Sequence, residues 1–336
     1  MGYNFCRLRS CEGMLATCER RPLSATAKLF CFKRLTVVCT LLCVLSIATP
    51  AQTRGLDQSP PPPLGKLVDV GGYRVHLYCT GAGSPTVVIV GAPYSVDWGL
   101  VQPEVAKITQ VCSYDHSGLG WSDDGPKDSC VLRVGEVHAA LKNAGIKGPY
   151  ILMGHSLGAL VARLYESQFP EEVAGLVLVD SAMPLSIVLA PPVGNASAPS
   201  PSPAPMHTTL LRGLDSDPNF NRLTPREREL HNWAKSRKHT APQSTDEIVQ
   251  HCFSELASVI KEHLHSLRDK PLVDVSTDED RSPDYVEFQA KLLSLSQSSK
   301  EIIAVGSSHY VIIDRPDAVI DATSQVLRSV RTNSKL

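Results

Sequence analysis

Residues 150–167 read YILMGHSLGALVARLYES. The apolar run YILMG predicts a buried strand, and ALVARLYES predicts a helix that follows it at once. Between them, GHSLG (154–158) holds Ser156 on a tight turn, whose flanking glycines let neighbouring backbone approach closely. This turn lifts the hydroxyl above the sheet, and the free N–H groups at the helix start favour a developing negative charge. We therefore expect Ser156 to be a nucleophile on a nucleophile elbow.

Strand and helix patterns alternate on both sides of this unit. Gly71-Gly72 predicts the turn of an opening hairpin. Further strands are expected at 66–70, 73–79, 86–91, 111–115, 173–180, 271–276 and 301–305, and helices at 98–108, 133–144, 283–295 and 317–330. Such alternation is typical of an α/β fold with a mostly parallel sheet and helices on both faces.

Composition and charge exclude several classes of protein. The chain has 336 residues, of which 43% are hydrophobic and 20% charged, as in a soluble globular protein. Its formal net charge of −1 gives no electrostatic reason to expect nucleic acid as a partner. Outside the first 50 positions no run of 18 apolar residues occurs, which excludes a polytopic membrane protein. The oligomeric state cannot be predicted from the sequence.

The first 51 residues have the pattern of a secretion signal. Residues 1–34 carry seven basic against two acidic side chains, and the apolar run LTVVCTLLCVLSIA (35–48) follows before Thr49-Pro50-Ala51. We expect residues 1–51 to be a signal peptide and the protein to be secreted or periplasmic. The alternative is an uncleaved membrane anchor at 35–48. Residues 52–65 read as a Pro-rich linker.

Residues 182–268 interrupt the alternation. Their first part is rich in Pro, Ala and Ser and predicts a disordered loop, whereas 225–235 and 246–268 have helical patterns. We expect this insertion to form a cap, or lid, over the carboxyl ends of the strands. The sheet domain would then consist of residues 66–181 and 269–336.

Three further motifs resemble a known family. They are YDHSGLGWSD (114–123), VAGLVLVDS (173–181) and SSHYVIIDRP (307–316). With GHSLG, they make residues 66–330 similar to the α/β-hydrolase fold superfamily, and especially to its exported, esterase-like serine hydrolases. The resemblance implies an eight-stranded, mostly parallel sheet with a helical cap between strands six and seven. It does not specify a substrate.

The resemblance also implies a Ser-His-Asp triad. His309, just after the last strand, stands where the family places its general base, whereas His155 is expected to be a structural turn residue. For the acid, two positions are weighed almost equally. Asp280 lies nine residues beyond Pro271 after strand seven, and Asp180 ends strand six. His116 is expected to be a surface loop residue.

An oxyanion hole needs two N–H donors. One is expected from Leu157, directly after the nucleophile. The other should come from the turn after strand 86–91, where Ala92 is the first candidate and Tyr94 the second, because Pro93 has no N–H. This turn departs from the His-Gly of the family, so whether it forms a working hole stays open.

These features favour a serine hydrolase that cleaves a carboxylic ester or a related acyl compound. The alternative is a binding protein that kept the fold with weak or no turnover. No metal or organic cofactor is implied, and the expected partner is a small acyl substrate. Four cysteines lie beyond residue 51, and the family's strand order would place Cys79 beside Cys112, so we expect these two to form a disulfide.

Overall fold

The computed structural model describes residues 60–91, 94–182, 213–237, 248, 251–257, 267–279 and 281–336. The expected leader, most of the linker and the Pro-rich start of the cap lie outside these residues, and so do Ala92 and Asp280. Among the described helices, none is both long and apolar enough to cross a membrane.

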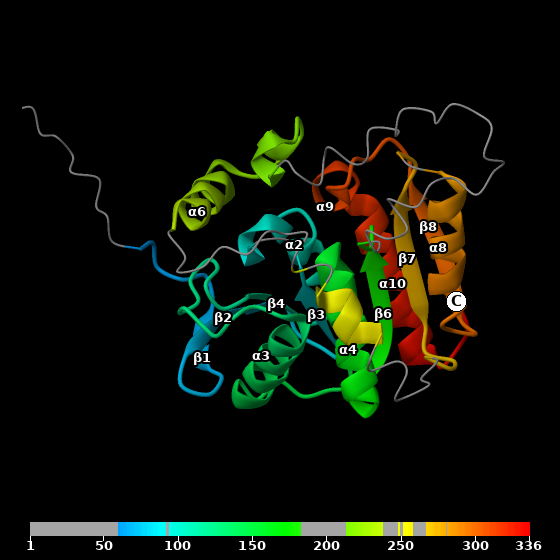
Figure 1. Ribbon diagram of the computed structural model, residues 1–336, viewed down its shortest axis with the longest axis horizontal. Helices are drawn as coiled ribbons and strands as arrows, with labels where there is room; N and C mark the ends of the chain where they lie inside the picture. Colours follow the sequence, from blue (N-terminus) through cyan, green and yellow to red (C-terminus); the bar gives the residue numbers. More distant parts are fainter. Residues whose placement is uncertain are drawn as a thin grey trace, which may run out of the picture. The chain divides into compact units, whose positions relative to one another are not determined.

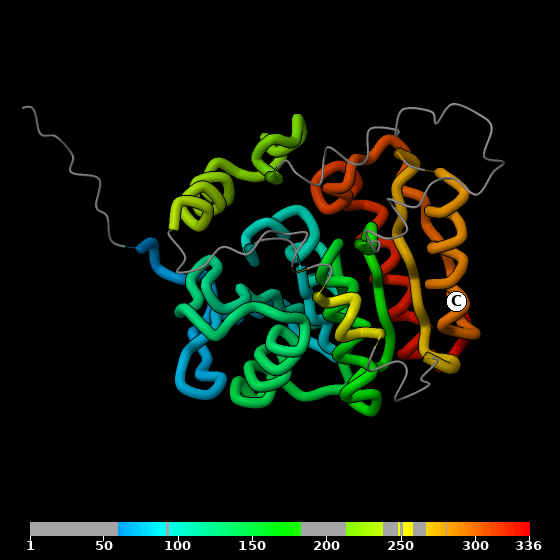
Figure 2. The backbone as a smooth tube through the Cα atoms, in the orientation of Figure 1, coloured from blue at the N-terminus to red at the C-terminus, as the bar shows by residue number. Residues whose placement is uncertain are grey.

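An eight-stranded sheet forms the centre of the fold, in the order β1-β2-β4-β3-β5-β6-β7-β8. Its strands are β1 (Lys66–Asp69), β2 (Arg74–Thr80), β3 (Thr86–Val90), β4 (Val111–Asp115), β5 (Tyr150–His155), β6 (Val173–Val179), β7 (Leu272–Thr277) and β8 (Ser299–Ala304). Only the β1–β2 and β2–β4 pairs are antiparallel. The chain runs from blue strands at one edge to orange strands at the other (Figure 2). The predicted mostly parallel α/β sheet is confirmed.

Helices cover both faces of the sheet (Figure 1). They are α2 (Gln102–Val105), α3 (Cys130–Asn143), α4 (Leu157–Gln168), α6 (Pro225–Ser236), α8 (Pro283–Leu293), α9 (Val311–Asp314) and α10 (Pro316–Thr332). Short 3-10 turns are η2 (Ser95–Trp98), η3 (Pro170–Glu172), η4 (Leu214–Ser216) and η5 (Phe220–Arg222). The predicted helix at 98–108 was wrong in its bounds, because η2 ends at Trp98 and only α2, with Pro103 in its first turn, is α-helical within that range.

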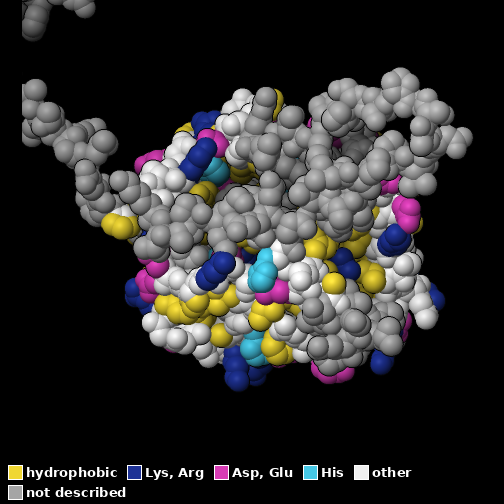
Figure 3. Space-filling model, viewed as in Figure 1, with side chains coloured by type: hydrophobic (Ala, Val, Ile, Leu, Met, Phe, Trp, Pro, Cys, Tyr) yellow, Lys and Arg dark blue, Asp and Glu magenta, His cyan; other side chains and the backbone are white. Residues whose placement is uncertain are grey.

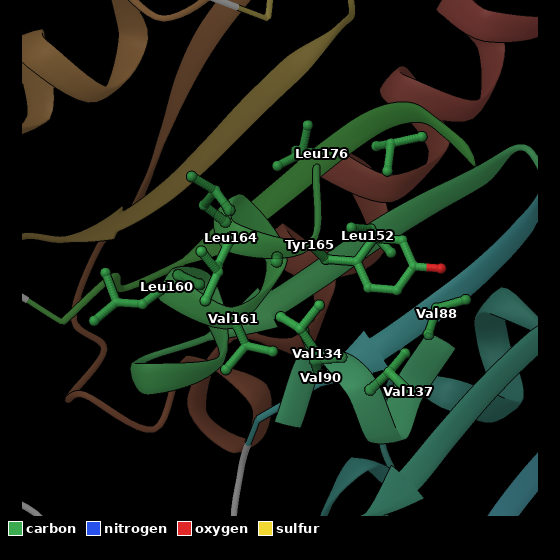
Figure 4. Packing of buried hydrophobic residues seen from close by; sticks show 14 of the residues in the cluster. Val88, Val90, Val134, Val137, Leu152, Leu160, Val161, Leu164, Tyr165 and Leu176 are labelled. Atoms are coloured by element: carbon green, nitrogen blue, oxygen red, sulfur yellow. The ribbon is translucent and has the colours of Figure 1, made fainter. Parts of the chain in front are cut away.

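Alternate residues of the central strands fill two separate cores. Leu152 of β5 packs with α3, α4 and α8, whereas its neighbours Ile151 and Met153 pack with α2, α9 and α10. Figure 4 shows the first core, where Val134 and residues of α4 meet the strands. A sheet buried on both faces explains why these strands read as continuous apolar runs.

The insertion between β6 and β7 is helical where it is described. Its helix α6 starts with a capping box, in which Thr224 and Glu227 each satisfy a backbone N–H of the other. Leu230 and Ala234 of α6 pack with Trp121 in a third apolar cluster beside η2.

Two disulfides join distant parts of the fold. Cys79 and Cys112, opposite each other on β2 and β4, are bridged with 4.0 Å between their Cα atoms. A second bridge links Cys130, the first residue of α3, to Cys252 in the helical segment 251–257. This bridge ties the returning part of the insertion to the sheet domain.

Candidate active site

Ser156 occupies a strained turn between β5 and α4. Its φ of 55° and ψ of −122° are unusual for a residue with a side chain. Three glycines permit the turn to form. A Cβ on Gly154 would lie 2.4 Å from the carbonyl oxygen of Gly158, and a Cβ on Gly158 would lie 2.1 Å from that of Val90. Gly91 has a φ of +93° and packs against the start of α4. The GHSLG pattern is therefore a steric requirement of this turn.

Replacing Gly158 with alanine should lower the free energy of unfolding by about 3 kcal/mol or more, because the new methyl group must push backbone atoms of β3 away. Urea unfolding followed by circular dichroism measures the change. Gly135, inside α3, is the matched control, since a Cβ there would meet nothing within 4 Å. Gly135→Ala should stabilise the protein by about 0.5–1 kcal/mol. Equal stability of the two variants would contradict this steric account.

A buried histidine–carboxylate pair also lies at the carboxyl ends of the strands. His309, in the loop after β8, donates from Nδ1 to Oδ2 of Asp180 over 2.6 Å, and each residue is at most 6% exposed. Asp180 directly follows β6. Because a carboxylate only accepts hydrogen bonds, this contact leaves Nε2 of His309 as the nitrogen that can take a proton. Asp280, the other candidate acid, lies outside the described residues.

Backbone contacts bring the three residues together. The N–H of Ser156 donates to the carbonyl of Val179, the residue before Asp180, over 2.9 Å. His155 donates from Nε2 to the carbonyl oxygen of His309 over 2.8 Å. Within the described residues, the Ser156 hydroxyl makes no hydrogen bond.

His155 holds the loop of His309 in place and stays neutral. Burial, followed by the neighbouring His309, lowers the pKa of His155 to about 3. Its Nε2–H is used by the carbonyl of His309, and its Nδ1 is buried without a partner among the described residues. A group with this pKa and no access to solvent is a poor base, in agreement with the structural role expected for it.

The N–H groups expected to form the oxyanion hole differ in whether they are already hydrogen-bonded. The N–H of Leu157, at the start of α4, makes no hydrogen bond to another described residue. The N–H of Tyr94 donates to Oδ2 of Asp97 over 3.1 Å, so Tyr94 is not a free donor and its candidacy was wrong. Ala92 lies outside the described residues.

The sequence analysis did not identify two residues that interact with Asp180, Tyr285 and Asp274. Tyr285 of α8 donates its hydroxyl to Oδ1 of Asp180 over 3.2 Å. Asp274 of β7 is fully buried, and neither of its oxygens has a partner among the described residues. Burial, with the charge of Asp180 next, raises the pKa of Asp274 well above its usual value. The sequence did contain a signal for Asp274, because this acidic residue stands within the apolar run PLVDV (271–275), which predicts a buried strand.

The expectation for His116 was wrong, because its side chain is buried. Its Nδ1 and Nε2 contact Glu136 over 2.5 Å and Asp128 over 2.9 Å. Burial alone would raise the pKa of Glu136, but the hydrogen bonds from His116 and Ser117 and the charge of His116 together outweigh it and hold that pKa below its usual value. This network ties the loop after β4 to α3.

Among the described residues, one group has the spacing of metal ligands: Cys130, Cys252 and Glu255. The two sulfur atoms form a disulfide, so neither is a thiolate ligand in this structure. On the face in Figure 3, the visible Lys and Arg side chains are interspersed with Asp and Glu.

Comparison with known sequences places this geometry in a family. A model described as the alpha/beta hydrolase family matches residues 44–322. An uncharacterized protein of Schizosaccharomyces pombe is 30% identical over 139 residues, which cover 32% of this chain and 26% of that protein. The 2-hydroxymuconate semialdehyde hydrolase of Pseudomonas sp. (strain CF600) is 34% identical over 128 residues, which cover 36% of this chain and 44% of that protein. The matches span less than half the length of these two curated relatives.

Solved structures share the fold. The crystal structure of a putative lipase from Acinetobacter baumannii AYE matches with a TM-score of 0.57 and 21% identity, covering 80% of this chain and 92% of that one. At this identity the likeness shows the fold alone. The family model, however, covers far more than half of the sequence, and the observed sheet agrees with it. The chain therefore belongs to the α/β hydrolase family.

Proposed function

We propose that the protein is a serine hydrolase that cleaves a carboxylic ester or a related acyl compound. The observation that carries the proposal is the buried His309–Asp180 pair, held at 2.6 Å beside the strained turn of Ser156. The 34% identity to a semialdehyde hydrolase over 128 residues supports hydrolytic chemistry. A small acyl compound is the proposed substrate.

In the proposed mechanism, Oγ of Ser156 attacks the carbonyl carbon while Nε2 of His309 takes the hydroxyl proton. Asp180 stabilises the imidazolium that forms. The Leu157 N–H donates to the new oxyanion. The C–O bond to the leaving alcohol then breaks, and His309 returns the proton to that alcohol. Water, activated by His309, finally hydrolyses the ester on Ser156 and frees the carboxylic acid.

We also propose that the protein works outside the cytoplasm, in an oxidising compartment. The bridges Cys79–Cys112 and Cys130–Cys252 support this, because disulfides persist chiefly in such compartments. The leader-like pattern of residues 1–51 agrees with export, either as a cleaved signal or as an anchor at 35–48.

A fluorophosphonate probe tests the proposed function. The wild-type protein should be labelled at Ser156 and should hydrolyse short p-nitrophenyl esters, whereas Ser156→Ala should do neither. A folded protein that resists the probe and hydrolyses none of these esters would reject the proposal. That result would favour the alternative of a binding protein.

Tyr285→Phe should lower kcat for ester hydrolysis by about tenfold with little change in KM, because Asp180 loses a hydrogen-bond donor that holds its carboxylate. Tyr150→Phe is the matched control. The Tyr150 hydroxyl donates to the carbonyl of Ile146 over 2.8 Å, at the amino-terminal end of β5. Steady-state kinetics that show the same kcat for both variants would contradict this role for Tyr285.

A further inference from the structure

The first described part of the insertion is hydrogen-bonded to the helix that follows His309. Asn219 donates its side-chain N–H to Oδ1 of Asp314, the last residue of α9, over 2.8 Å. Arg222 of η5 donates to the carbonyl oxygens of Ile313 and Asp314 over 2.5 and 2.7 Å. Because α9 begins two residues after His309, these contacts tie the insertion to the loop that carries the candidate base.

A further contact reaches the loop itself, at Ser308. Its Oγ lies 3.0 Å from Oδ2 of Asp217, which stands between η4 and η5, and 2.7 Å from Oδ2 of Asp314. The same Oγ accepts the N–H of Tyr310 over 3.2 Å, and the N–H of Ser308 donates to Oδ2 of Asp314 over 2.8 Å. Hydrogen bonds of this one serine therefore hold the backbone on both sides of His309.

The two carboxyl groups at Ser308 need one more proton than two carboxylates and a hydroxyl provide. A serine hydroxyl carries one hydrogen, so it can donate to only one of the two aspartates. The other contact is a hydrogen bond only if that carboxyl group carries a proton and donates it to Oγ, which still has an acceptor position beside the Tyr310 N–H. Without this proton, two negative charges would face each other across the hydroxyl.

Asp217 is the carboxyl group that holds this proton. Asp314 accepts from the N–H and the hydroxyl of Ser308 and from the amide of Asn219, as a carboxylate does. Oδ1 of Asp217 accepts the N–H of Asn219 over 2.7 Å, which leaves its Oδ2 to donate. Burial raises the pKa of Asp217 and the charge of Asp314 adds to the rise, although the hydrogen bonds from Asn219 and Ser308 act against it.

Charged groups on the neighbouring elements have other partners. The pairs are Asp215 of η4 with Lys235 of α6, Arg222 of η5 with the carbonyl oxygens at the end of α9, and His309 with Asp180. Burial, the largest cause, raises the pKa of Tyr310 to about 12, so this residue does not titrate at neutral pH. Among the described residues, Asp314 is thus the charged group that shares the Ser308 hydroxyl with Asp217.

We propose that Asp217 is a positioning residue of the insertion, which holds the loop of His309 through Ser308 while it shares a proton with Asp314 and releases the loop when that proton is lost. The proposal rests on the serine hydrolase function proposed above. It makes the contact between the insertion and the general base sensitive to pH. Asp217 does not touch the reacting atoms.

The direction of the pH effect follows from the raised pKa of Asp217. An aspartate in an unfolded chain titrates near about pH 3.9. The stabilising contact is therefore fully present below about pH 4 and is lost as the pH rises through the pKa of the folded state. Asp217→Asn removes this dependence. Its amide oxygen can accept the Asn219 N–H in place of Oδ1, and its NH₂ group then donates toward Ser308 at every pH.

The test measures kcat for p-nitrophenyl ester hydrolysis by the full chain between about pH 4 and about pH 8. The ratio of kcat in Asp217→Asn to kcat in wild type should be about one at the acidic end. It should rise to about three- to tenfold at the upper end, with KM changed by less than about twofold. Taking the ratio removes the titration of His309, which both proteins share. A merely structural role for Asp217 would give a ratio that does not vary with pH.

Asp215→Asn is the matched control, because it makes the same change two residues away, at a carboxylate that pairs with Lys235. Its kcat relative to wild type should not vary with pH. Ser308→Ala removes the hydroxyl between the two aspartates and should lower kcat at the acidic end by about tenfold. In that background, adding Asp217→Asn should bring no gain at the upper end.

Urea unfolding gives a second measurement, which does not depend on activity. The urea midpoint of wild type should fall relative to that of Asp217→Asn as the pH rises. A difference between the two midpoints that stays constant across the pH range would overturn the inference, because the contact would then not depend on a proton at Asp217.

The possible outcomes separate this inference from the proposed function. If the fluorophosphonate fails to label wild type, the proposed function is rejected and the positioning role with it. If wild type is labelled and the kcat ratio of Asp217→Asn matches that of Asp215→Asn at every pH, only the positioning role is overturned. Should Ser308→Ala fail to fold, the two aspartate variants decide the question alone.

Discussion

Asp180→Asn should lower kcat for ester hydrolysis by roughly 10⁴-fold, the largest effect expected of any change outside Ser156 and His309. The reason lies in the 2.6 Å contact between Oδ2 of Asp180 and Nδ1 of His309. An asparagine amide no longer compensates the imidazolium charge, and it favours the ring tautomer that cannot accept the Ser156 proton. Steady-state kinetics on a p-nitrophenyl ester, with folding checked by circular dichroism, measure the loss.

Asp280→Asn is the control for this prediction, since the sequence weighed the two acids almost equally. We expect it to change kcat by less than about twofold. The reverse result, with Asp280→Asn nearly inactive and Asp180→Asn close to wild type, would move the acid to the loop after β7. In that case the observed Asp180–His309 contact would be structural.

Removing the Cys130–Cys252 bridge should lower the free energy of unfolding by about 4 kcal/mol. The two cysteines are 122 residues apart, so the bridge closes a long loop and removes much conformational freedom from the unfolded chain. Urea unfolding of the variant with Cys130→Ser and Cys252→Ser, in the absence of reductant, measures the loss.

The second disulfide is the comparison for the first. Cys79 and Cys112 are 33 residues apart, so their replacement by serine should destabilise by about 1 kcal/mol less if loop closure dominates. A loss below about 1 kcal/mol for the Cys130–Cys252 pair would show that the segment around Cys252 is held mainly by other contacts.

Much of the fold could be predicted from local patterns. Continuous apolar runs such as TVVIV (86–90) identify strands buried on both faces, and a glycine on either side of Ser156 identifies the turn that exposes it. These patterns are local because strand burial and turn sterics act over a few residues. The same reasoning failed for 98–108, where the apparent helical period gives only the four-residue helix α2.

Tertiary structure alone decided which polar groups meet. Asp180 contacts His309 across 129 positions, and Asp97 contacts His231 across 134, because sheet order and the docking of α6 bring their elements together. His116 was expected at the surface, but it is buried, because the packing of α3 brings Glu136 into contact with its ring. No short-range pattern encodes such pairs. Hydrogen-bond partners depend on distances between elements that local propensity does not determine, whereas the strand–turn–helix unit around Ser156 depends on the residues within it.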